Sequence, residues 1–147
     1  CKMLLLLYIA DVDLRKSNYQ LPDINFLLTL LDNSLDVKKD SIYSLMVTLK
    51  GLNYEISPKL WENFYVNEYK NFNISIDGLK PNIYLILEES VKKRNIAEVV
   101  LITIDLLNTP RKKGSDYYSI YKAINALNEI GLRQYARNFG LEINLDI

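Results

Sequence analysis

Apolar residues recur every three to four positions along most of this chain, at the period of an α-helix. The clearest stripes, in chain order, are Ile24, Leu27, Leu28, Leu31 and Leu35; Ile42, Leu45, Met46, Leu49 and Leu52; and Ile96, Val99, Val100, Thr103 and Leu107. This spacing places the apolar side chains on one face of a helix, whereas the alternation typical of a half-buried strand is not sustained anywhere in the sequence. The pattern therefore predicts an all-α protein.

Proline and glycine mark where the apolar stripes begin and end. Pro22, Pro58 and Pro81 lie at the starts of stripes, where a missing backbone N–H costs little because the first helical turn has no partner for it. Gly51 and Gly131 lie near the ends of stripes, where glycine often terminates a helix. These signals predict about eight helices, near residues 3–16, 22–35, 40–52, 58–70, 80–94, 96–108, 116–130 and 132–143.

Two segments of the chain are similar to each other. Residues 42–54 read IYSLMVTLKGLNY and residues 120–132 read IYKAINALNEIGL, which aligns Tyr43 with Tyr121. The shared positions are mostly those of the apolar stripe, and the similarity extends to both sides once small gaps are allowed. It predicts one all-helical domain made of two related four-helix halves with a connector between them. The domain covers residues 1–147 and its halves cover about 1–70 and 80–147.

Each half reads as two helical hairpins of about 39 residues, within the roughly 34 to 47 residues of helical-repeat units. The chain thus resembles α-helical hairpin-repeat proteins of the tetratricopeptide or HEAT-like kind, although the strict tetratricopeptide pattern is not reproduced. Its ending, IGLRQYARNFGLE, is similar to the terminal helices of long bacterial helical proteins. The resemblance implies stacked antiparallel hairpins in an α-solenoid. A closed helical bundle is the alternative, because it uses the same stripes and loop lengths.

The charges of the chain balance, since 18 basic and 18 acidic residues give a net charge of zero. Proteins that bind nucleic acid or anionic membranes usually carry a basic surface, so this balance argues against both partners. Helical repeats that bind RNA can stack bases on tyrosine, but they normally line a basic groove. The apolar run at residues 3–10 is also shorter than the roughly 20 residues that span a bilayer.

Histidine is absent from the sequence. Its absence removes the commonest general base and the commonest metal ligand. Acidic pairs such as Asp11 with Asp13 and Glu88 with Glu89 are typical of solvated helix faces, because carboxylate catalysis needs groups that converge from different elements. The sequence therefore predicts that the chain is not an enzyme and that it holds no cofactor or metal.

The single cysteine, Cys1, cannot form an intramolecular disulfide, which favours a reducing and hence cytoplasmic location. A lipoprotein trimmed to its lipid-bearing cysteine would also begin in this way. Membrane anchoring through Cys1 is therefore the alternative location, and a fragment of a longer chain is another explanation for the missing initial methionine.

Eleven tyrosines and the lone Trp61 are the most suggestive residues for function. Tyr and Trp are favoured at protein interfaces because they offer a large rigid area with a polar end, although such residues also close the edges of cores. We expect a non-catalytic interaction or scaffold module that binds a protein partner, with self-association as a further mode. Tyr43, Tyr121 and Trp61 are the predicted contacts, and Arg133 and Arg137 the predicted rim charges. A helical accessory domain of a larger enzyme and a lipid-anchored envelope protein are the alternatives.

Overall fold

Eight helices make up the secondary structure that the computed structural model describes, which covers residues 1–12, 20–34, 37–69, 81–108 and 116–145. The helices are α1 (Lys2–Ala10), α2 (Ile24–Asp32), α3 (Lys39–Gly51), α4 (Pro58–Tyr69), α5 (Pro81–Lys92), α6 (Ile96–Asn108), α7 (Asp116–Glu129) and α8 (Arg133–Leu145). Those residues contain no strand. The predicted all-α class is therefore confirmed.

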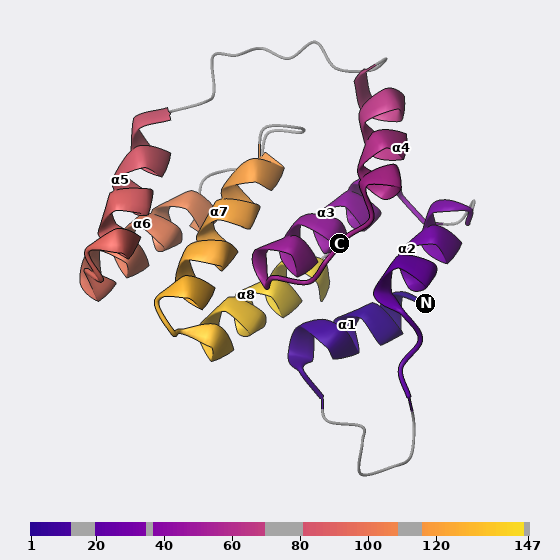
Figure 1. Ribbon diagram of the computed structural model, residues 1–147, viewed down its shortest axis with the longest axis horizontal. Coiled ribbons are helices and arrows are strands. Elements are labelled where there is room, and N and C mark those ends of the chain that lie inside the picture. The colour runs from indigo at the N-terminus through magenta and orange to yellow at the C-terminus, as the bar shows by residue number, and fades with distance from the viewer. Residues whose placement is uncertain (13–19, 35–36, 70–80, 109–115, 146–147) are drawn as a thin grey trace.

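The helices form two groups of three that meet along one pair of helices (Figure 1). In the first group α1, α2 and α3 lie against one another, and in the second group α5, α6 and α7 do the same. The groups meet where α3 lies beside α7. Helix α8 packs on α7, α3 and α1 and so ties the groups together, while α4 lies against α2.

Helices α3 and α7 run in the same direction. Tyr43 contacts Tyr117 near the start of each helix, whereas beyond their middles Gly51 lies against Ile124. A Cβ atom at Gly51 would lie 2.9 Å from the Ile124 Cγ2 atom, so the absent side chain allows the two helices to approach closely. The two segments that the sequence aligns as repeats therefore pack on each other. The stacked solenoid arrangement is not confirmed by this packing and stays a prediction.

Helix α7 contributes to both hydrophobic clusters of the protein. Ile120, Ile124 and Leu127 face the larger cluster, which also contains buried side chains of α1, α2, α3 and α8. Ala123 and Ala126 face the smaller cluster, where they meet side chains of α5 and α6. Helix α7 thus joins the two groups of helices, because one of its faces packs in each cluster.

Helix α8 is held against the first group by a close approach and by polar contacts. A Cβ atom at Gly140 would lie 2.7 Å from the Thr48 Cγ2 atom and 3.2 Å from the Ile9 Cγ2 atom. The buried Asn144 side chain donates a hydrogen bond of 2.9 Å to the Thr48 hydroxyl. The Arg137 guanidinium donates to the main-chain oxygens of Tyr8 and Ile9 at 3.1 and 2.9 Å, which satisfies carbonyls at the end of α1.

Two details of the predicted helices are corrected. Helix α1 ends at Ala10 rather than near residue 16, because Asp11 takes a left-handed conformation (φ 55°) and the Val12 N–H turns back to the Leu7 carbonyl. Helix α2 begins after Asp23, whose carboxylate accepts a hydrogen bond from the Phe26 N–H, so Pro22 lies just outside it.

Both glycines lie near helix ends as predicted, since α3 ends at Gly51 and Gly131 follows α7 with a left-handed conformation (φ 92°). The left-handed residue after α3 is Asn53 (φ 67°). The sequence predicts the connector between the halves over residues 69–80, and all of it except Tyr69 lies outside the described residues.

Candidate partner-binding surface

Six aromatic side chains from four helices form two groups of three contacting rings, and because α7 contributes to both groups we call the six together the aromatic band. They are Trp61 of α4, Tyr43 of α3, Tyr84 of α5, and Tyr117, Tyr118 and Tyr121 of α7. The band follows from the packing of the helices, because α7 lies between α3 and α5 and carries three of the six rings.

Three rings of the band come from α3, α4 and α7. The Tyr43 ring lies edge-on to the Trp61 ring at 5.9 Å between centroids and edge-on to the Tyr117 ring at 4.6 Å. The Tyr117 hydroxyl donates to the Asp40 carbonyl at 3.4 Å. Edge-to-face pairs of this kind add about 0.5–1.5 kcal/mol each beyond the area they bury, so these rings hold one another in place.

The other three rings line the contact between α5 and α7. The Tyr118 ring lies 5.0 Å from the Tyr84 ring and 6.2 Å from the Tyr121 ring. The Tyr84 hydroxyl and the Ser119 hydroxyl share a hydrogen bond of 2.6 Å. The Lys122 ammonium lies 5.6 Å from the centre of the Tyr118 ring, which places a cation beside the π-face of an exposed aromatic.

A paired charge lies at the edge of the band. Lys122 forms a hydrogen-bonded ion pair with Glu88, so α7 and α5 are linked by charge as well as by rings. The hydrogen bond from Lys122, reinforced by the Lys122 charge, lowers the pKa of Glu88. Burial works to lower the pKa of Lys122, but the hydrogen bond to Glu88 and the negative groups around it prevail and raise that pKa. Both groups are therefore charged at neutral pH.

Exposure differs among the rings of the band. Tyr118 is 48% exposed, whereas the other five are half-buried. Tyr43, Trp61, Tyr117 and Tyr121 all pack against the larger hydrophobic cluster. The band is thus anchored in the core on one side and open to solvent on the other, with Tyr118 as its most accessible member.

The residues predicted from sequence fall in two places. Tyr43 and Trp61 contact each other in the band, and Tyr121 belongs to its other half through Tyr118. Arg137 lies elsewhere, bound to the end of α1 and 3.6 Å from the Asp11 carboxylate, and Arg133 is exposed at the start of α8. The structure thus places Tyr43 and Trp61 in one group of rings and Tyr121 in the other, and it gives Arg137 a structural contact. Their role in partner binding stays a prediction.

Sequence reasoning did not select Tyr117 and Tyr118 for this surface. The signal for them is the spacing in DYYSIY, residues 116–121, where Tyr118 and Tyr121 are separated by three positions and so lie on one helix face. That spacing becomes informative only when the neighbours of α7 are known.

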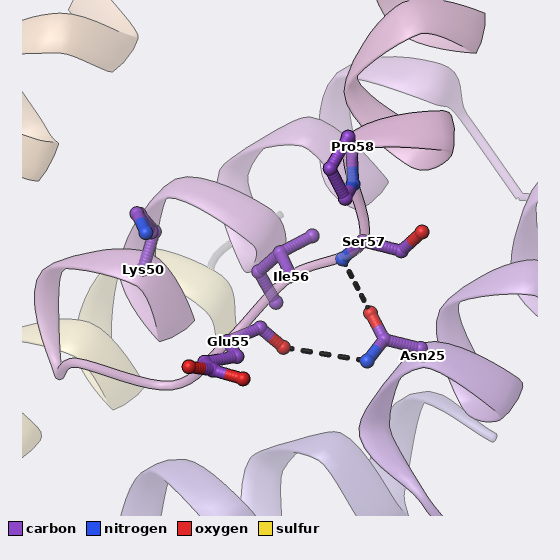
Figure 2. Close-up of a pocket in the computed structure, with 6 residues that line it drawn as sticks. All are labelled: Asn25, Lys50, Glu55, Ile56, Ser57 and Pro58. Carbon is purple, nitrogen blue, oxygen red and sulfur yellow. Dashed lines mark hydrogen bonds between the residues drawn. The ribbon is translucent and has the colours of Figure 1, made fainter.

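An open depression of about 330 Å³ lies between α2 and the loop that precedes α4 (Figure 2). The Asn25 amide in its lining is already engaged, because it accepts a hydrogen bond from the Ser57 N–H at 2.7 Å and donates one to the Glu55 carbonyl at 3.3 Å. Asn25 thus fastens the loop to α2. We interpret the depression as a by-product of this structural contact, and the aromatic band is the stronger candidate for binding.

The part of the chain that the structure describes shows neither a cluster of metal ligands nor a membrane-spanning helix. In those parts of the chain no three His, Cys, Asp or Glu side chains are grouped so that they could hold a metal ion. None of the described helices has both the length and the apolar character needed to cross a membrane.

In comparisons with known proteins, no family model, no curated protein and no solved structure matches the chain.

Proposed function

We propose that this chain is a non-catalytic helical module that binds a segment of another protein across the aromatic band. The observation that carries the proposal is the two groups of three contacting aromatic rings that share α7, one of which contains Tyr118 at 48% exposure. Tyr and Trp provide a large contact area at a low cost in side-chain entropy, and they dominate the binding energy of many protein interfaces.

The competing interpretation of the band is that its rings only close the edge of the core. That interpretation accounts for Tyr43 and Tyr117, which pack on the larger hydrophobic cluster and on each other. It accounts less well for Tyr118, whose ring lies on two tyrosines of the band and beside Lys122 yet stays half-exposed. Tyr118 is therefore the residue at which the two interpretations predict different results.

The chemistry of the band suggests the kind of segment that it binds. An apolar or aromatic side chain of the partner would cover the Tyr118 ring and exclude water from it. Beside that ring, Lys122 and Glu88 provide one donor and one acceptor, and each already has a counter-charge. A partner segment with apolar anchors flanked by neutral polar groups fits this surface better than a highly charged one, because it leaves the ion pair intact.

Affinity capture from the source cells, with mass spectrometry of bait and co-purifying proteins, tests the proposal. Wild type is compared with Tyr118→Ala and with the matched control Tyr135→Ala, which removes a 61% exposed tyrosine of α8 outside the band. Circular dichroism confirms that each variant is folded. We expect a stoichiometric partner that is lost with Tyr118→Ala and retained with Tyr135→Ala.

The double variant Tyr43→Ala with Tyr121→Ala extends the test to the half-buried rings, provided that it remains folded. Retention of the partner by Tyr118→Ala would contradict binding through the band. If no partner co-purifies and the bait belongs to a longer polypeptide with a catalytic domain, the independent module is refuted and the accessory-domain alternative takes its place.

A further inference from the structure

Helix α8 buries mainly small and polar residues. Its buried residues are Ala136, Gly140, Ile143 and Asn144, of which only Ile143 has a large apolar side chain. Helix α2 has 9 residues against the 13 of α8, yet it buries four large apolar side chains, Ile24, Leu27, Leu28 and Leu31. The stabilisation that a helix gains from burial grows with the apolar area removed from water, so burial holds α8 less strongly than α2.

The contact between α8 and α3 contains buried polar atoms without partners. Ser44 and Thr48 lie one turn apart on the same face of α3, and the Thr48 hydroxyl accepts a hydrogen bond from Asn144 of α8. The Ser44 hydroxyl and the Asn144 side-chain oxygen are buried, and neither has a hydrogen-bond partner within the described part of the chain. When α8 separates from α3, water can bind both atoms. Their hydration lowers the free energy needed for the separation.

The contact between α8 and the end of α1 is polar as well. The Arg137 guanidinium donates hydrogen bonds to the Tyr8 and Ile9 carbonyls and lies 3.6 Å from the exposed Asp11 carboxylate. Carbonyls at the end of a helix are readily hydrated once their side-chain partner leaves. The link between α8 and α1 can therefore break without leaving an unpaired buried group.

We propose that α8 is a detachable helix, which separates from α1 and α3 as one unit and rebinds while the other helices stay folded. Local opening of this kind occurs where a segment buries few large apolar side chains. The opening uncovers the face of α3 around Thr48 and the carbonyls of Tyr8 and Ile9. None of the six residues that define the aromatic band belongs to α8, so the opening is independent of the proposed binding function.

Native-state hydrogen exchange of the full chain, followed by NMR, tests the proposal. The Phe139 and Gly140 amides report on the middle of α8, away from fraying ends. In wild type we expect them to be at least about tenfold less protected than the slowest amides of α3. Their protection should also depend less on urea, because opening one helix exposes less surface than unfolding the protein. Equal protection of the α8 amides and the slowest α3 amides would overturn the proposal.

A substitution far from α8 separates local opening from global unfolding. Val99 is completely buried in the smaller cluster, so Val99→Ala should lower the protection of the slowest α3 amides at least about tenfold. The protection of the α8 amides should stay within about twofold of wild type, because the smaller cluster remains intact when only α8 opens. A loss of protection by the same factor in α3 and α8 would show that α8 does not open by itself.

Two arginines of α8 provide a matched pair of variants that tests the link to α1. Arg137→Met keeps the aliphatic part of the side chain but removes the hydrogen bonds to α1, and should lower the protection of the α8 amides at least about fivefold. Arg133→Met changes an exposed arginine at the start of the same helix and should leave that protection unchanged. Equal protection of α8 in the two variants would contradict the proposed opening from α1.

Discussion

The contact between α3 and α7 predicts that Gly51→Ala destabilises the protein. A Cβ atom at this position would lie 2.9 Å from the Ile124 Cγ2 atom, 3.0 Å from the Ile124 Cβ atom and 3.2 Å from the Tyr121 carbonyl oxygen. Two of these three atoms cannot swing away, because one is main chain and the other is attached directly to it. The helices must therefore separate slightly to accept the added methyl group.

The magnitude follows from two opposed effects. Alanine is favoured over glycine by about 1 kcal/mol in the interior of a helix. Gly51 is the last residue of α3, so the variant gains only a fraction of this value. Overpacking a close contact typically costs about 1 to 3 kcal/mol, and Ile124 is completely buried, so relief is limited. We expect a net loss of about 1 to 2 kcal/mol, equivalent to a fall of roughly 3–6 °C in the Tm of a chain of this size.

Urea denaturation followed by far-UV circular dichroism measures this loss as a lower transition midpoint at an unchanged m value. Ile124→Leu removes the branched Cγ2 atom while conserving volume, so the combined variant should lose less stability than the two single variants added together. A Gly51→Ala protein as stable as wild type, or more stable, would refute the close approach of α3 and α7.

The structure also predicts the direction in which four further substitutions change stability. Ser44 is completely buried and its hydroxyl has no hydrogen-bond partner, so in urea denaturation Ser44→Ala should leave the free energy of unfolding unchanged or raise it by up to about 1 kcal/mol. Thr48→Val should lower it, because the substitution removes the hydroxyl that accepts a hydrogen bond from the buried Asn144 amide. Asn25→Ala removes both hydrogen bonds that hold the loop before α4 and should cost about 1 to 2 kcal/mol in the same assay, and an unchanged midpoint would contradict that role. Lys122 lowers the pKa of Glu88, so the ion pair stabilises the fold above the ordinary carboxyl pKa of 4.5 and this stabilisation is lost as the pH falls below it. In thermal unfolding, Glu88→Gln should therefore have a lower Tm than wild type at pH 7, and the difference should disappear below pH 4.5. A difference in Tm that stays constant with pH would argue against the pair.

The helices could be predicted from the sequence because their signals are local. Helix α6 begins and ends at the predicted residues, and Pro58 and Pro81 are the first residues of α4 and α5. The end of α1 could not be predicted in this way. It depends on the left-handed conformation of Asp11. Aspartate tolerates this conformation, but the presence of an aspartate in a sequence does not predict it.

Only part of the candidate surface could be predicted from the sequence. The internal repeat makes Tyr43 and Tyr121 equivalent, but the structure gives them different aromatic neighbours, because α3 and α7 lie side by side. The half-exposed Tyr118 depends on α5 packing beside α7, which apolar spacing does not encode. Arg137 is a similar case, since it reaches main-chain oxygens of α1 that are far away in the sequence. In each case the deciding contact is long-range.

Isothermal titration calorimetry of the captured partner with wild type, Tyr118→Ala and Tyr135→Ala tests binding through the aromatic band most directly. Truncation of a tyrosine at the centre of an interface commonly costs 2 kcal/mol or more, so Tyr118→Ala should raise the Kd by about 30-fold. Tyr135→Ala, outside the band, should stay within about twofold of wild type, as surface substitutions away from a binding site usually do. A folded Tyr118→Ala protein that binds the partner as tightly as wild type would contradict the account.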